Sequence, residues 1–202
     1  VAAILAVMED DTIEHGPIEG LITATEETGM DGAFGLKGGL LKGEILLNLD
    51  SETEGELYVG CAGGTDVNAT LNYTAEAAPE TGYEAFEIAV KGCKGGHSGI
   101  QIVCQRANAN KLLFRLLRKL SAKMELKLAS VDGGGLRNAI PRESVAVVMV
   151  KAADVEAFKA EVAAFEQMAV AEFAAVEDSI SVKATAVAIP AEVMPCATAK
   201  SL

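Results

Sequence analysis

The pattern of apolar and polar residues is clearest in the second half of the chain. Apolar side chains alternate along residues 83–91 and place Phe86, Ile88 and Val90 on one face of an expected strand. The same patterns predict strands at residues 124–131, 144–150 and 179–189 and helices at residues 108–120 and 154–176. The resulting order, strand, helix, strand, strand, helix, strand, is that of the ferredoxin-like fold.

Each expected helix carries a single apolar stripe. In the first helix the stripe consists of five leucines, Leu112, Leu113, Leu116, Leu117 and Leu120. Burying each of these is worth about 1.5–3 kcal/mol, and so short a helix needs a sheet to pack on. The stripe of the second helix consists of Val155, Phe158, Val162, Phe165 and Ala169. Asp154 is expected to be its N-cap.

A different pattern is found near the N-terminus. Two short apolar strands are expected at residues 21–24 and 44–49, joined by a glycine-rich connection long enough for a short helix. Such a crossover implies parallel strands. Glu26 and Glu27 follow the first strand and Asp50 follows the second, so their carboxylates are expected at one sheet edge, where ligands bind in α/β proteins. The three acids form either a cation site or a group of solvated loop residues.

Together these patterns predict an α+β chain in which a ferredoxin-like domain is inserted into an α/β domain that is only partly present. The expected boundaries are residues 1–60 for the partial α/β domain, 61–190 for the inserted domain and 191–202 for the return. A further strand is expected at residues 67–73. Residues 1–9 have the pattern of the middle of an apolar helix, without an N-cap or initiator methionine. We therefore expect the sequence to be a fragment.

Charge and cysteine content narrow the function. The 202 residues carry 17 basic and 29 acidic side chains, a net charge of −12, which is unsuited to nucleic acid or an anionic membrane surface. No apolar run approaches the roughly 18 residues of a membrane span. The cysteines, Cys61, Cys93, Cys104 and Cys196, lie far apart with no CxxC pair. This spacing predicts reduced thiols in a cytosolic protein.

The Glu26–Glu27 pair suits metal-assisted hydrolysis. Neighbouring side chains on an extended backbone point opposite ways, so one carboxylate can bind metal while the other takes a proton from a bound water, and Asp50 can supply a second ligand. A calcium loop starting at Asp50 is the alternative. Its twelfth position requires glutamate and is Cys61 here, so calcium is rejected.

The inserted domain contains two further candidate stretches. KGGHSG (residues 94–99) places His97 in a loop whose glycines allow a ligand to approach the backbone. LRNAIPRE (residues 136–143) places Arg137 beside Asn138, and an arginine there can bind a carboxylate through two hydrogen bonds. The alternatives are a turn histidine without a role and a solvated hairpin tip.

Seven motifs in this order resemble the aminoacylhistidine (Xaa-His) dipeptidases, which are cytosolic di-zinc exopeptidases. They are HGPIE, EE-x-GM-x-GAFGL, ILLN-x-DSE-x-EGE, GCAGG, KGGHSG, R-x-NANKL and LRNAIPRE. The resemblance implies a ferredoxin-like lid, or dimerisation, domain inserted into a metallopeptidase catalytic domain. It also implies Glu26 as general base, Glu27 and Asp50 as zinc ligands, and His97, Asn138 and Arg137 as substrate contacts.

The chain departs from this family in its metal ligands. The family's His-x-Asp pair, bridging Asp and downstream His have no counterpart, because the only histidines are His15 and His97. The expected function is therefore zinc-dependent hydrolysis of dipeptides by a longer cytoplasmic protein, a homodimer formed through the lid, with this chain inactive by itself. The alternative is a non-catalytic ferredoxin-like module for dimerisation or small-ligand binding.

Overall fold

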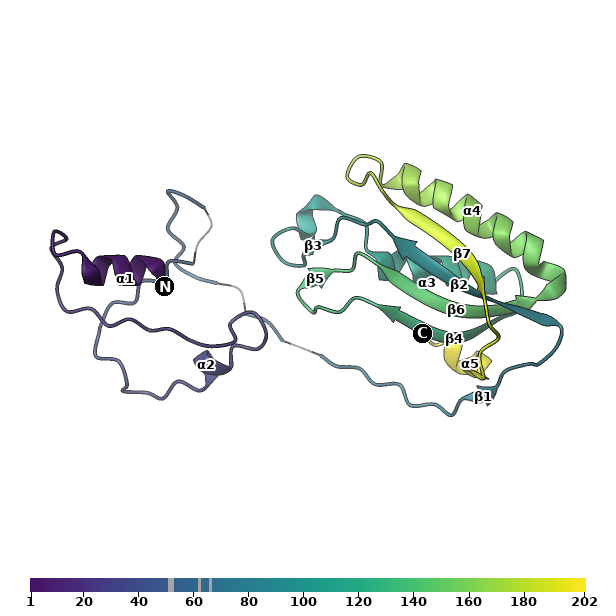
Figure 1. Cartoon of the computed structure of the whole chain (residues 1–202), viewed down its shortest axis with the longest axis horizontal. Helices are drawn as coiled ribbons and strands as arrows, with labels where there is room; N and C mark the ends of the chain where they lie inside the picture. Colours follow the sequence, from purple (N-terminus) through teal and green to yellow (C-terminus); the bar gives the residue numbers. More distant parts are fainter. Residues whose placement is uncertain (51–52, 62, 66) are drawn as a thin grey trace. The chain divides into compact units, whose positions relative to one another are not determined.

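The structure is a computed structural model that describes residues 1–50, 53–61, 63–65 and 67–202. The chain divides into two compact units, Val1–Val67 and Asn68–Leu202 (Figure 1). Each unit is described by itself below. No helix of the described residues is long and apolar enough to cross a membrane.

The second unit is built on a four-stranded antiparallel sheet. Its strands are β2 (Tyr83–Lys91), β4 (Leu126–Gly133), β6 (Ser144–Lys151) and β7 (Ser181–Val187), in the order β4-β6-β2-β7. The helices α3 (Ala109–Ser121) and α4 (Val155–Glu172) connect β2 to β4 and β6 to β7. The α+β class and the ferredoxin-like order of elements are thus confirmed.

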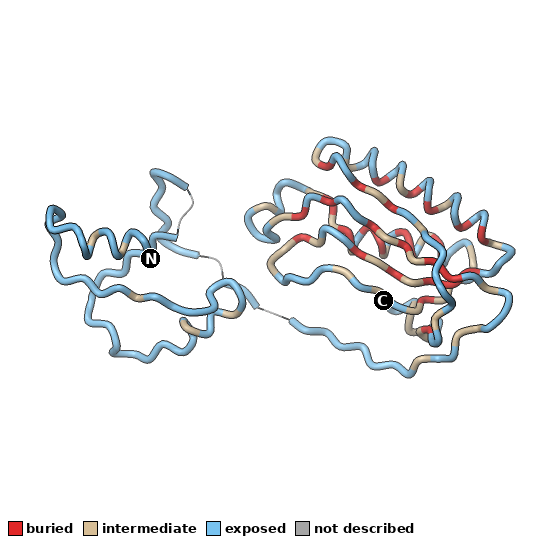
Figure 2. The backbone as a smooth tube through the Cα atoms, viewed as in Figure 1, coloured by how far each residue is buried: buried red, intermediate tan, exposed pale blue. Residues whose placement is uncertain are grey.

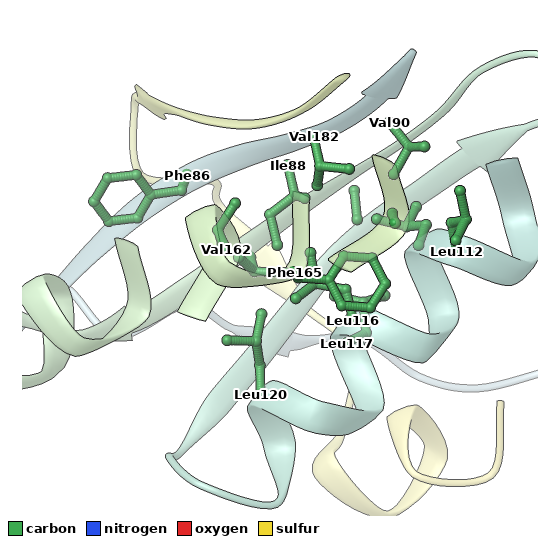
Figure 3. Close-up of a cluster of buried hydrophobic side chains, with 14 of the residues drawn as sticks. Phe86, Ile88, Val90, Leu112, Leu116, Leu117, Leu120, Val162, Phe165 and Val182 are labelled. Carbon is green, nitrogen blue, oxygen red and sulfur yellow. The ribbon is translucent and has the colours of Figure 1, made fainter. Parts of the chain in front are cut away.

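One face of this sheet packs on both helices and forms the main core (Figures 2 and 3). Phe86, Ile88 and Val90 of β2 lie in this core, as the alternating pattern predicts. All five leucines of the α3 stripe and all five members of the α4 stripe are buried with them. The rings of Phe86 and Phe158 are 4.9 Å apart between centroids and join β2 to α4.

The two helices begin differently. The Oδ1 atom of Asn108 accepts a hydrogen bond of 3.1 Å from the Lys111 N–H and caps α3. Asp154 occupies the N-cap position of α4, but its side chain makes no capping hydrogen bond. The 3-10 turn η2 (Ala152–Asp154) leads directly into α4 and holds Asp154 in a helical conformation. The expected N-cap position of Asp154 is therefore confirmed, but the capping hydrogen bond is not formed, since capping residues typically have an extended backbone.

The opposite face of the sheet has a smaller core of Ala85, Met149 and Val193. Here β1 (Glu76–Ala77) pairs with β8 (Glu192–Val193), and α5 (Cys196–Ala199) contacts β4. The expected strand at residues 67–73 is wrong, because these residues form no helix or strand and pairing begins only at β1.

The first unit contains two helices, α1 (Ala2–Glu9) and α2 (Asp31–Phe34), and no strand among its described residues. The strands expected at residues 21–24 and 44–49 are therefore wrong. Ile45, Leu46 and Leu47 are 83%, 80% and 77% exposed. A parallel strand is stable only when neighbouring strands pair with it and helices cover it, and the described residues of this unit supply no strand to pair with.

The four thiols are free, and only Cys93 is buried. Burial, and secondarily the negative charge of Glu177, raises the pKa of the Cys93 thiol to about 11. Because the thiolate is the reactive form, a maleimide at pH 8 is expected to label the three exposed cysteines of the folded chain and to spare Cys93. Mass spectrometry should count three labels in the native chain and a fourth after unfolding in urea. Four labels in the native chain would contradict this burial.

Candidate functional site

Two of the expected site residues are brought together by a short pair of strands in the second unit. β3 (Gly96–His97) pairs with β5 (Ala139–Ile140), with His97 opposite Ala139. The Ser98 N–H extends this pairing by donating to the Asn138 carbonyl oxygen at 2.8 Å. His97 and Asn138 are 41 positions apart in the sequence and become neighbours through these backbone hydrogen bonds. The sequence motifs gave the two residues separately and gave no indication of this pairing.

The imidazole of His97 is exposed, and the backbone fixes its orientation. Its Nδ1 atom lies 3.0 Å from the Gly99 nitrogen and 3.3 Å from the Ile100 nitrogen. Both backbone groups are donors, so Nδ1 is the acceptor and the proton of the neutral ring is on Nε2. The ring therefore offers an N–H donor to a ligand.

The loop that leads to His97 depends on its glycines. Gly95 and Gly96 have φ angles of 67° and 139°, which side chains rarely tolerate. A Cβ at Gly96 would lie 2.5 Å from Oε1 of Gln101. That Oε1 atom accepts the His97 backbone N–H at 2.8 Å, and Arg106 Nη1 donates to the Gly95 carbonyl at 2.6 Å. The motif glycines thus allow two side chains to reach the loop backbone.

Glu177 is a residue of this region that the sequence patterns did not single out. It lies in the turn between α4 and β7 and is only 7% exposed. Its Oε2 accepts the Lys94 N–H at 2.8 Å, and its Oε1 accepts the Ala107 N–H at 2.9 Å. In the sequence it is one acid among many on an acidic chain, and nothing in its neighbourhood distinguishes it.

Arg137 and Asn138 lie in the connection between β4 and β5. Arg137 is exposed, whereas Asn138 is half-buried beside β3. Arg137 therefore lies at the surface, next in sequence to Asn138.

In the first unit, Glu26 and Glu27 lie in an exposed turn. The turn starts at Thr25, whose φ is +57°, and the Thr25 carbonyl accepts the Gly29 and Met30 N–H groups at 3.0 and 2.6 Å. A left-handed backbone at a β-branched residue is strained, and the Thr25 hydroxyl offsets this by donating to Oδ2 of Asp31 at 2.9 Å. The Glu pair is thus presented by a turn and not by a strand end.

Asp50 is also exposed, and its N–H donates to Asn48 Oδ1 at 3.0 Å. The next two residues of its DSE motif, Ser51 and Glu52, lie outside the described residues. The common sheet edge expected for Asp50 and the Glu pair is absent, since neither flanking strand is formed.

Within the described residues, no three His, Cys, Asp or Glu side chains gather closely enough to hold a metal ion. Structural and catalytic zinc sites need three or four N, O or S ligands from the protein. Glu27 and Asp50 alone, two carboxylates without an imidazole, do not meet this requirement. The described residues by themselves therefore do not fit a zinc centre.

Comparison with known proteins gives a consistent picture. Residues 88–177 match the family described as "Peptidase dimerisation domain". The chain is 46% identical over 188 residues to the cytosol non-specific dipeptidase of Escherichia coli (strain K12). This match covers 93% of this chain and 39% of that protein. Its fold matches the crystal structure of aminoacylhistidine dipeptidase from Vibrio alginolyticus with a TM-score of 0.72 and 41% identity, covering 98% of this chain and 40% of that one. The chain thus spans about two fifths of the relatives that it matches.

Proposed function

We propose that the chain contains the lid of a metal-dependent dipeptidase, because it is related to an aminoacylhistidine dipeptidase over nearly its whole length. The full protein would hydrolyse dipeptides of the Xaa-His type. The observation that carries this proposal is the pairing of β3 with β5, which makes His97 and Asn138 neighbours within a sequence 46% identical to a dipeptidase.

The residues of the lid would bind the substrate and stabilise the transition state. His97 donates its Nε2 proton to the oxygen of the scissile carbonyl as negative charge develops there, and its Nδ1 hydrogen bonds hold the ring in the donor tautomer. Asn138 contacts the bound substrate from the adjacent segment. Arg137 pairs with the carboxylate of the dipeptide, which suits a planar guanidinium.

The acids of the first unit would carry out the proton transfer and contribute to the metal site. Glu26 takes the proton of the attacking water and passes it to the leaving amine. Glu27 and Asp50 are the proposed ligands of two zinc ions, together with side chains from outside this chain. Zinc supplies polarisation of the carbonyl and a more acidic water.

By itself, the chain of 202 residues is expected to hydrolyse no dipeptide and to lose zinc during gel filtration, because two carboxylates do not complete a zinc shell. The full protein is expected to hydrolyse Xaa-His dipeptides and to become inactive after treatment with a chelator. Free histidine is measured by chromatography and zinc by elemental analysis. Stoichiometric zinc on the 202-residue chain would show that the ligand count is wrong.

A homodimer formed through the lid is the second expectation. β4 and β7 are the outer strands of the four-stranded sheet, and outer strands need to be paired or covered. The match of residues 88–177 to a peptidase dimerisation domain supports the same assembly. Analytical ultracentrifugation of the full protein at micromolar concentration should give a dimer. A monomer under these conditions would exclude it.

A non-catalytic module is the second candidate function. It is favoured by the distribution of buried residues, since the main core lies in the second unit and the described part of the first unit has no buried residue. A full protein that is dimeric, binds no zinc and hydrolyses no dipeptide would decide for the module. In either case we propose a cytoplasmic location, which the four free thiols support.

A further inference from the structure

We propose that Glu177 is a positioning residue for His97 and holds the loop that presents the imidazole. The inference rests on the proposed function, because His97 acts on substrate only in a dipeptidase. Glu177 itself is buried and lies among backbone groups.

The carboxylate of Glu177 connects three segments that are distant in the sequence. Its own segment is the turn after α4, and its two oxygens bind the backbone of Lys94 and Ala107, which are 83 and 70 positions away. Lys94 lies just after β2 and Ala107 just before α3. Hydrogen bonds from backbone N–H groups to an ionised carboxylate are about twice as strong as those between neutral groups.

Both of these contacts lead to the same peptide of the His97 loop. Lys94 precedes Gly95 directly. Ala107 follows Arg106, whose Nη1 donates to the Gly95 carbonyl at 2.6 Å. Fixing Lys94 and Ala107 therefore fixes Gly95 from both sides, and β3 with His97 begins at the next residue.

The neighbouring acid Asp178 differs in each of these respects. Its side chain is 72% exposed, and it pairs with the side-chain Nζ of Lys94 at 3.3 Å and not with the loop backbone. It thus serves as a matched control for a change of charge at this turn.

Replacing Glu177 with glutamine keeps the shape of the side chain and exchanges one acceptor oxygen for an NH₂ donor that faces a backbone N–H. The buried N–H then lacks a partner, and the loop is released from that side. We expect Glu177→Gln to lower kcat of the full protein by about tenfold, the result of a displaced transition-state donor, with KM changed less and bound zinc unchanged. Asp178→Asn should leave kcat within about twofold of wild type, because exposed ion pairs contribute little.

A double-mutant cycle separates positioning of His97 from a general role. If Glu177 acts through His97, Glu177→Gln should lower kcat no further in a His97→Ala background. Equal losses in both backgrounds would overturn the proposal. Glu177→Asp keeps the charge and shortens the side chain, so it should recover part of the rate that Glu177→Gln loses. If Glu177→Gln does not fold, Glu177→Asp takes its place in the cycle.

A second arm does not require activity. Hydrogen exchange of the 202-residue chain should show faster exchange at the amides of Lys94, Ala107 and His97 in Glu177→Gln, with amides in the middle of α4 unchanged. Unchanged exchange at the loop, or an equal increase throughout the domain, would also overturn the proposal. If the full protein hydrolyses no dipeptide, the proposed function fails, and this arm still reports whether Glu177 holds the loop.

Discussion

Replacing His97 with alanine in the full protein is expected to lower kcat for dipeptide hydrolysis by about 10²–10³, or about 2.7–4 kcal/mol in the barrier. The reason is the loss of the Nε2 donor that the Gly99 and Ile100 N–H groups set in place. Bound zinc should stay at the wild-type level, since the proposed role of the imidazole is to contact substrate and not metal. Glu27→Ala should instead lose both zinc and rate.

His15 provides the matched control for this change. It is the only other histidine of the chain, it is exposed, and it lies in the first unit. His15→Ala should leave kcat and zinc content unchanged. A His97→Ala protein within threefold of the wild-type rate would end the proposed role, and one that lost its zinc would make His97 a ligand.

The second large effect concerns the stability of the lid. Phe158→Ala is expected to lower its free energy of unfolding by about 3–5 kcal/mol, the range for phenylalanine removed from a packed core. Phe158 is fully buried, and its ring packs on Phe86 at 4.9 Å between centroids. Urea unfolding of the 202-residue chain, followed by far-ultraviolet circular dichroism, measures the change.

Phe34→Ala is the control, because that side chain is 81% exposed at the end of α2. It should change the midpoint of the same transition by less than the equivalent of about 0.5 kcal/mol. Equal effects of the two substitutions would mean that the α4 stripe does not hold the lid together.

The lid was predictable because its elements repeat a strong local pattern. The leucines of α3 and the stripe of α4 follow helical spacing, and every member of both stripes is buried. The strand containing Phe86, Ile88 and Val90 was predicted with the same bounds as β2. Helices and antiparallel strands of this kind obtain their partners within one continuous stretch of chain, so periodicity was sufficient.

The sequence was misleading where an element needs partners from elsewhere. Residues 44–49 have the composition of a buried strand, yet Ile45, Leu46 and Leu47 are exposed, because the described residues of this unit form no sheet. The roles of Glu26, Glu27 and Asp50 stay predictions, because the strands expected to bring these three residues together are not formed.

Contacts of backbone with side chains were also beyond the reach of the sequence. The motifs identified His97 and Asn138, but not the β3–β5 pairing that joins their segments. Glu177 acts through backbone N–H groups of Lys94 and Ala107, and such partners have no side-chain signature.

The claim that the lid presents an oriented His97 donor is tested most directly by finding which ring nitrogen of each imidazole carries the proton. This is read from ¹⁵N chemical shifts of the 202-residue chain at alkaline pH, where the imidazole is neutral. In His97 the neutral ring should carry its proton on Nε2, because Nδ1 accepts from two backbone N–H groups. In His15 the proton should favour Nδ1, which lies 2.7 Å from the Gly16 carbonyl oxygen. His97→Ala assigns the signals. A His97 ring protonated on Nδ1, or one averaging between the two forms, would contradict the claim that the lid presents an oriented donor.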